Sequence, residues 1–225
     1  MKFIKHFTRW LFIVCLLLFI SSTVIRIFAS EPFVQNKLMS YANVVDSTTF
    51  TSEELLLISH SMSEYLTDDS DLLDIRITLD QRNVPLFSSK EILHMRDVKQ
   101  ILLKVYLLQE FTILFISVYI ISIFLWAKER RLGDFFTDLF LAGSIGNLLL
   151  IFLGILLTFS FDRYFVYFHE LAFSNDFWLL DPRKDALVQI YPLEFWNYIV
   201  IALITTIVII NCIMILIDRL FKKIN

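Results

Sequence analysis

The chain has 225 residues, of which 57% are hydrophobic, and 23 of them are phenylalanine. Its mean hydropathy of +0.67 lies well above that of soluble domains, so we predict an integral membrane protein. The formal net charge of −3 offers no basic surface, and we expect no nucleic-acid partner.

Four apolar segments are close to or longer than the roughly 20 residues with which a helix crosses a bilayer. We expect these transmembrane helices at residues 10–29, 101–127, 135–161 and 196–217. The fold class is then an all-α integral membrane protein with four transmembrane helices and a small extracytoplasmic α+β cap between the first and second. We interpret the first segment as an uncleaved anchor, because it is longer than the apolar core of a signal peptide.

Basic residues near the segment ends predict the orientation of the chain. They all fall on one side of the membrane: Lys2, Lys5, Arg9, Lys128, Arg130, Arg131, Arg219, Lys222 and Lys223. By the positive-inside rule that side is the cytoplasm, which then holds residues 1–9, 128–134 and 218–225. Residues 30–100 and 162–195 are extracytoplasmic in this prediction.

The first outer region contains the predicted cap. Thr51 to Leu66 has apolar residues at helical spacing and begins with the capping box Thr51-x-x-Glu54, so we expect an amphipathic helix. Ile75 to Leu79 alternates apolar and polar residues, and after a turn at residues 80–83 the segment Val84 to Phe87 returns. We therefore predict a hairpin, with Pro85 in an edge strand.

A long helix is predicted to follow the cap. Ser88-x-x-Glu91 is a second capping box, and no proline or glycine interrupts the sequence before Gly133, so one helix is expected over residues 90–128. Such a helix exceeds the bilayer core by several turns, so its first turns lie in or above the headgroup layer.

Those first turns contain the first candidate site, His94-Met95-Arg96-Asp97-Val98-Lys99. His94 and Asp97 are three residues apart on a helix, which allows the carboxylate to fix the imidazole tautomer or raise its basicity. The other interpretation is a solvated helix turn with incidental charges.

Two polar features lie inside the predicted spans. Gln109 and Glu110 either face a water-filled cleft or, in the simpler interpretation, form hydrogen bonds with Asn147 of a neighbouring helix. Ala142-x-x-x-Gly146 predicts that the third span packs closely against another helix.

The second candidate site lies in the aromatic region between the third and fourth spans, which we expect at the membrane interface. Its residues are His169, Asn175, Trp178, Asp181 and Asp185. Either aspartate could orient His169, the amide could donate to an oxyanion, and the indole could hold an acyl chain. The alternative is a capped loop whose tryptophan belongs to the interfacial aromatic belt.

No metal or cofactor site is expected. Cys15 and Cys212, the only cysteines, lie in apolar segments, and the histidines lack metal-ligand spacing. Ser88, Ser89 and Ser174 each lie near a candidate histidine, but none has the Gly-x-Ser-x-Gly pattern of a nucleophile elbow.

These motifs resemble the lipoprotein intramolecular transacylase (Lit) family of Gram-positive bacteria over nearly the whole chain. The resemblance is carried by His94-Met-x-Asp-Val-Lys99, Phe168-His169-x-x-x-Phe173-x-Asn175-x-x-Trp178-x-Leu180-Asp181-Pro182-x-x-Asp185 and Tyr191-Pro192-x-x-Phe195-Trp196. It implies a bacterial cell-membrane enzyme that moves the sn-2 acyl chain of a lipoprotein's diacylglyceryl-cysteine to the α-amine of that cysteine. It also implies that His94 and His169 are the catalytic pair.

The hypothesis for the site follows from this resemblance and from the residues together. Asp97 and Asp181 are expected to orient the histidines, and Asn175 and Arg163 to contact an oxyanion or headgroup. Lys99, Trp178 and Asp185 complete the expected site. The expected partners are a diacylated lipoprotein substrate and membrane lipid, and the protein is expected to be a monomer.

Two other functions remain open from the sequence. One is an outward-facing lipid hydrolase or ping-pong acyltransferase, which would release fatty acid or form an acyl-enzyme. The other is a non-enzymatic scaffold or sensor in which the histidines have a structural or pH-sensing role.

Overall fold

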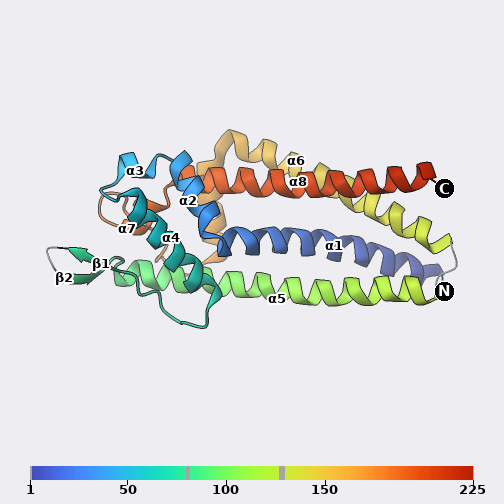
Figure 1. Ribbon diagram of the computed structural model, residues 1–225, viewed down its shortest axis with the longest axis horizontal. Helices are drawn as coiled ribbons and strands as arrows, with labels where there is room; N and C mark the ends of the chain where they lie inside the picture. The colour runs from blue at the N-terminus through green and yellow to red at the C-terminus, as the bar shows by residue number, and fades with distance from the viewer. Residues whose placement is uncertain (1, 80–81, 127–129, 225) are drawn as a thin grey trace. The chain divides into compact units, whose positions relative to one another are not determined.

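The computed structural model describes residues 2–79, 82–126 and 130–224 and is mostly helical. Its long helices are α1 (Lys2–Ser30), α5 (Ser89–Trp126), α6 (Arg130–Ala172) and α8 (Leu193–Ile224). These four helices are long and apolar enough to cross a membrane, which confirms the prediction of four membrane-length helices (Figure 1). Asp80 and Gln81 in the predicted turn, Ala127 in the predicted second span and Lys128 in the orientation set lie outside the described residues. Arg82 and Asn83, also predicted in the turn, instead belong to a strand.

The chain forms two compact units. The first comprises residues 1–25, 105–156 and 203–225, and the second comprises residues 26–104 and 157–202. Each long helix contributes one part to each unit, because every unit boundary falls within a helix.

The first unit contains an apolar cluster and a buried ion pair. Phe12 of α1 stacks on Tyr119 of α5 with ring centroids 4.4 Å apart. Arg9 Nε donates to Asp138 Oδ1 at 2.9 Å, and the Tyr119 hydroxyl donates to Asp138 Oδ2 at 3.3 Å. Because Asp138 is fully buried, this network specifies how α1, α5 and α6 pack, since a carboxylate without these partners would be costly there.

Small residues bring α6 close to α8, as the Ala142-x-x-x-Gly146 pattern predicted. Ala142 is fully buried. A Cβ atom added to Gly143 would lie 2.6 Å from the backbone oxygen of Asn211, and one added to Gly146 would lie 2.6 Å from Asn211 Nδ2. A side chain at Gly143 would therefore force the two helices apart, whereas one at Gly146 would displace the side chains of Asn211 and Leu17.

Gln109 and Asn147, which lie inside the spans, do not form the hydrogen bond with each other that the sequence suggested. Gln109 Nε2 donates to Thr23 Oγ1 of α1 at 2.8 Å. Asn147, the partner that the sequence suggested, instead has its Nδ2 3.4 Å from Cys212 Sγ of α8. A hydrogen bond between helices is therefore present, but to α1, because residue spacing cannot tell which neighbouring helix a side chain faces.

The second unit contains the short elements. Between α1 and α5 the chain forms α2 (Pro32–Tyr41), α3 (Val44–Ser47), α4 (Ser52–Thr67), β1 (Arg76–Leu79) and β2 (Arg82–Pro85), and before α8 it forms α7 (Ala186–Ile190). The predicted capping box is present, because Glu54 N donates to Thr51 Oγ1 and Thr51 N donates to Glu54 Oε2. The two strands pair antiparallel, with Ile77 opposite Val84.

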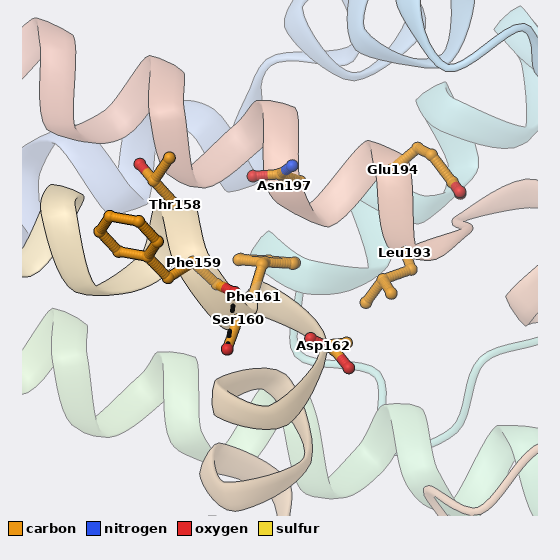
Figure 2. Close-up of a pocket in the computed structure, with 8 residues that line it drawn as sticks. All are labelled: Thr158, Phe159, Ser160, Phe161, Asp162, Leu193, Glu194 and Asn197. Carbon is orange, nitrogen blue, oxygen red and sulfur yellow. Dashed lines mark hydrogen bonds between the residues drawn. The ribbon is translucent and has the colours of Figure 1, made fainter.

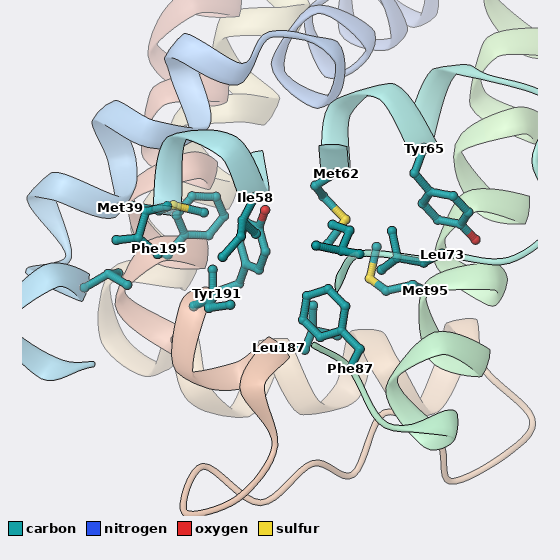
Figure 3. Packing of buried hydrophobic residues seen from close by; sticks show 14 of the residues in the cluster. Met39, Ile58, Met62, Tyr65, Leu73, Phe87, Met95, Leu187, Tyr191 and Phe195 are labelled. Carbon is teal, nitrogen blue, oxygen red and sulfur yellow. The ribbon is translucent and has the colours of Figure 1, made fainter. Parts of the chain in front are cut away.

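One apolar core holds these short elements together. It combines residues from α2, α4, the start of α5, α7 and the start of α8, and Figure 3 shows how their side chains meet. The labelled members are Met39, Ile58, Met62, Tyr65, Leu73, Phe87, Met95, Leu187, Tyr191 and Phe195. Thus the cap of this unit packs directly on the helix turn that contains the first candidate site.

Helix α6 is interrupted at Ser160, which has a non-helical backbone (φ −161°, ψ 51°). The predicted third span ends at about this point, but residues 162–172, expected as a loop, form a further helical segment. The spacing of its inward side chains explains why: Phe165, His169 and Phe173 recur every four residues, with Phe165 half-buried and the other two buried. Asp162 and Arg163 are exposed at the start of this segment.

The close contact between α6 and α8 leads to a stability prediction. Gly143→Ala should lower the free energy of unfolding by about 1–3 kcal/mol, because the new methyl group meets the Asn211 backbone. Thermal unfolding in detergent, followed by intrinsic fluorescence, measures this as a lower Tm. The matched control is Gly154→Ala on the same helix, where a Cβ atom meets nothing within 4 Å. Equal Tm values for the two variants would contradict the close approach.

Candidate active site

Both candidate histidines belong to the second unit, and both are buried. His94 lies one turn into α5, and His169 lies in the last turn of α6. Each side chain is only 7% exposed, which is unusual for an isolated polar ring. Their ring centroids are 5.9 Å apart, so the structure brings together two residues that are far apart in the sequence.

The hydrogen bond of His169 defines its tautomer. Its Nδ1 lies 2.6 Å from the carbonyl oxygen of Phe165, and a carbonyl can only accept, so Nδ1 carries the proton. In the neutral ring the lone pair is then on Nε2. His94 differs, because its buried Nδ1 has no hydrogen-bond partner among the residues that the structure describes.

Aromatic rings surround His169. The centroid distances to its ring are 4.3 Å for Phe165, 5.4 Å for Phe168, 5.5 Å for Phe173 and 5.2 Å for Trp178. Phe173 also contacts His94 at 5.1 Å. The two imidazoles therefore share an apolar environment, in which bulk water has little access and electrostatic interactions are strong.

Asp97 and Asn175 join α5 to the loop at residues 173–185. Asn175 Nδ2 donates to Asp97 Oδ2 at 2.8 Å, and Asn175 Oδ1 accepts from the backbone N–H of Phe177 at 3.1 Å. Asp97 is one turn after His94, and Asn175 lies between the two loop aromatics that pack on His169. This pair holds the loop in position.

Two further residues of α5 hold the same region. Lys90 Nζ donates to the carbonyl oxygen of Leu179 in the loop. Glu91, only 2% exposed, accepts from the backbone N–H of Ser88 at 2.7 Å and from that of Leu187 at 2.6 Å. Its carboxylate thus satisfies free N–H groups at the starts of both α5 and α7.

The remaining predicted site residues have partners away from the histidines. Lys99 donates to Asp68 Oδ1 at 2.8 Å, a hydrogen bond that lowers the pKa of Asp68, and it lies 4.3 Å above the Tyr65 ring. Its side chain thus connects α5 to the end of α4.

Asp181 and Asp185 stabilise the loop itself. Hydrogen bonds from the Arg183 side chain and backbone lower the pKa of Asp181, and Asp185 Oδ2 accepts from the Asp181 backbone N–H at 2.6 Å. In the part of the chain that the structure describes, neither carboxylate bonds to His169. Arg163 is exposed on the terminal segment of α6.

An open pocket of about 270 Å³ with mixed polar and apolar lining lies at the break in α6, but neither histidine lines it (Figure 2). Asp162 and Glu194 contribute its charged groups, and Ser160 and Asn197 contribute other polar groups. No predicted site residue borders this pocket, and the described residues contain no cluster of three or more potential metal ligands.

Two contributors to the site were absent from the sequence-based hypothesis. Glu91 was recognised only as a cap for its own helix, because nothing local indicates that it also reaches Leu187. Phe165 is absent from that hypothesis, because the hypothesis places residues 162–195 in a loop. The signal was available as Phe165-x-x-x-His169-x-x-x-Phe173, which has helical spacing.

Comparisons with known proteins agree with the sequence motifs. The model of the family described as lipoprotein intramolecular transacylase Lit matches residues 10–196. An uncharacterized protein of Aquifex aeolicus (strain VF5) is 29% identical over 171 residues, which cover 76% of this chain and 74% of that protein.

Solved structures share the fold. The membrane-integral lipoprotein intramolecular transacylase Lit of Bacillus cereus is 23% identical, with a TM-score of 0.79 over 99% of this chain and 98% of that chain. A variant of that protein with a histidine replaced by arginine gives a TM-score of 0.72 at 21% identity, over 99% of this chain and 95% of that chain.

The double role of Glu91 leads to a second prediction. Glu91→Gln should lower the free energy of unfolding by about 1–3 kcal/mol, because an amide oxygen replaces a carboxylate that accepts from two buried N–H groups. The control is Glu54→Gln in the exposed capping box of α4, where a smaller loss is expected. Tm values in detergent measure both, and an equal loss would contradict a special role for Glu91.

Proposed function

The chain belongs to the Lit family of lipoprotein intramolecular transacylases, and from this premise we propose the reaction and the residues that carry it out. It is a multi-pass membrane enzyme that acts on lipoproteins. The proposed reaction moves the sn-2 acyl chain of diacylglyceryl-cysteine to the α-amine of the same cysteine and leaves a lyso-form lipoprotein.

The observation that carries the proposal is the buried histidine pair, 5.9 Å between centroids, in which the Nδ1 proton of His169 is held by Phe165. The unprotonated Nε2 of His169 makes it the base in this proposal. An α-amine with a pKa near 8 must lose a proton before it attacks an ester, and a neutral imidazole suits that step.

The proposed steps balance as follows. The amine nitrogen bonds to the sn-2 carbonyl carbon while His169 Nε2 accepts a proton from that nitrogen. The tetrahedral intermediate then breaks its bond to the glycerol oxygen, which takes a proton from neutral His94 while His94 accepts the proton held by His169. Both rings end neutral, as they began, and the amide product remains. Ester and amine belong to one molecule, so no acyl-enzyme is needed.

The apolar surroundings of the pair favour transfer over hydrolysis. Trp178 and the phenylalanines beside His169 limit access of water, which would otherwise compete with the amine. Asp97 and Asn175 hold the loop that supplies Trp178, so we assign them positioning roles. Ser174, the nucleophile in the ping-pong alternative, is exposed.

We further propose that both termini are cytoplasmic and that the histidine pair lies at the extracytoplasmic face. The distribution of lysine and arginine supports this orientation. In this orientation the substrate would enter from the side, out of the outer leaflet. Contacts of Lys99, Arg163, Asp181 and Asp185 with the substrate remain predictions from the sequence.

Replacing either histidine tests the catalytic assignment. His94→Ala and His169→Ala should each lower the rate by about 10²–10⁴-fold while the protein still inserts into the membrane. Mass spectrometry of N-terminal peptides from a reporter lipoprotein distinguishes N-acyl from O-acyl product. His60→Ala, an exposed histidine of α4, is the control and should keep normal activity. Normal product from either site variant would refute the assignment.

Exclusion of water gives a separate prediction. Trp178→Ala should increase the release of free fatty acid relative to N-acyl product, because the larger opening beside His169 admits water as a competing nucleophile. Chromatography of released fatty acid, alongside peptide mass spectrometry, measures this ratio. Tyr198→Ala, an exposed aromatic residue of α8, should leave the ratio unchanged. An unchanged ratio in Trp178→Ala would argue against this role of the indole.

A further inference from the structure

Helix α2 presents an outward face that remains largely exposed. Phe33, Lys37 and Tyr41 recur every four residues, and the two aromatic rings are 75% and 56% exposed. The opposite face is packed, with Gln35, Leu38 and Met39 buried. An apolar face this exposed requires a partner.

Neighbouring elements indicate what that partner is. Helix α2 begins two residues after α1, a helix of membrane length, and runs crosswise to the first turns of α8 (Figure 1). Its Tyr41 lies 6.2 Å from Tyr198, which is in the second turn of membrane-length α8. Tyr41 therefore lies beside the start of a helix that is long and apolar enough to cross a membrane.

The terminal segment of α6 has a second face of the same kind. Tyr164, Tyr167, Phe168 and Leu171 lie on one side, and Leu171 is 90% exposed. The other side of this segment contains the buried His169. The residue that we assign as the base is therefore one helix diameter away from an exposed apolar face.

We propose that these two faces form one interfacial surface that lies in the boundary between lipid headgroups and acyl chains. Aromatic rings favour that boundary, and the Lys37 ammonium, 5.1 Å above the Tyr41 ring, can reach the lipid phosphates. By lying at the headgroups, the surface holds the histidine pair at the depth in the bilayer where the ester of a lipid substrate lies. That effect on substrate access rests on the proposed function, whereas the contact of the surface with lipid does not.

The depth of individual residues tests the proposal without an activity measurement. Nitroxide labels are attached to Phe33→Cys and Leu171→Cys in a background with Cys15→Ala and Cys212→Ala, in nanodiscs of phosphatidylcholine and phosphatidylglycerol. Leu149→Cys, exposed within a span, is the control for the acyl core. Leu72→Cys, 50% exposed between Asp71 and Asp74, is the control for water.

Accessibility to oxygen and to a nickel chelate then ranks the four labels. Phe33→Cys and Leu171→Cys should both lie between the two controls. A label at either position that matches Leu72→Cys would overturn the proposal, because that face would lie in water. Spin–spin broadening between molecules at Phe33→Cys would also overturn it, because a second copy would then cover α2.

A second measurement tests the functional consequence. Phe33→Glu should lower the rate on a diacylated lipopeptide in nanodiscs by about fivefold, because a charge replaces an apolar anchor. In detergent micelles, where no bilayer depth is defined, the same variant should match the parent. Leu72→Glu should match the parent in both. Equal loss in nanodiscs and detergent would indicate a folding defect and count against depth control.

Discussion

The geometry of the second unit depends on the two hydrogen bonds that the buried Glu91 carboxylate accepts. The carboxylate accepts hydrogen bonds from backbone N–H groups at the start of its own helix and at the start of α7. A charged acceptor with 2% exposure is stable only while both bonds are present, since an unpaired buried charge costs several kcal/mol. The orientation of α5 and the position of the following segment are therefore determined together.

That link matters because the site is assembled from both sides of it. His94 belongs to α5, whereas Phe173 and Trp178 belong to the loop that precedes α7. Lys90, Glu91 and Asp97 bind this loop region at three positions. Such preorganisation places the aromatic rings before a substrate binds, so their ordering does not oppose the reaction.

The environment of the pair suits the proposed transfer between two parts of one lipid. In that reaction the amine needs a neutral base, and the ester must be kept from water. The His169 ring, whose one hydrogen-bond partner among the described residues is a backbone carbonyl and whose neighbours are aromatic side chains, meets both needs. The first unit has a different task, because its buried Arg9–Asp138 pair and its glycine contacts fix helix packing rather than chemistry.

The number of long helices, the capping boxes of Thr51 and Ser88, and the choice of the two histidines as candidates could all be predicted from the sequence. These follow from local rules, since apolar length and residue spacing act within one helix. Tertiary packing makes Glu91 bind Leu187 and makes Asp97 meet Asn175. It also makes Lys99 bind Asp68. Each of these depends on which segments pack together, and a polar side chain selects its partner from neighbours that folding supplies.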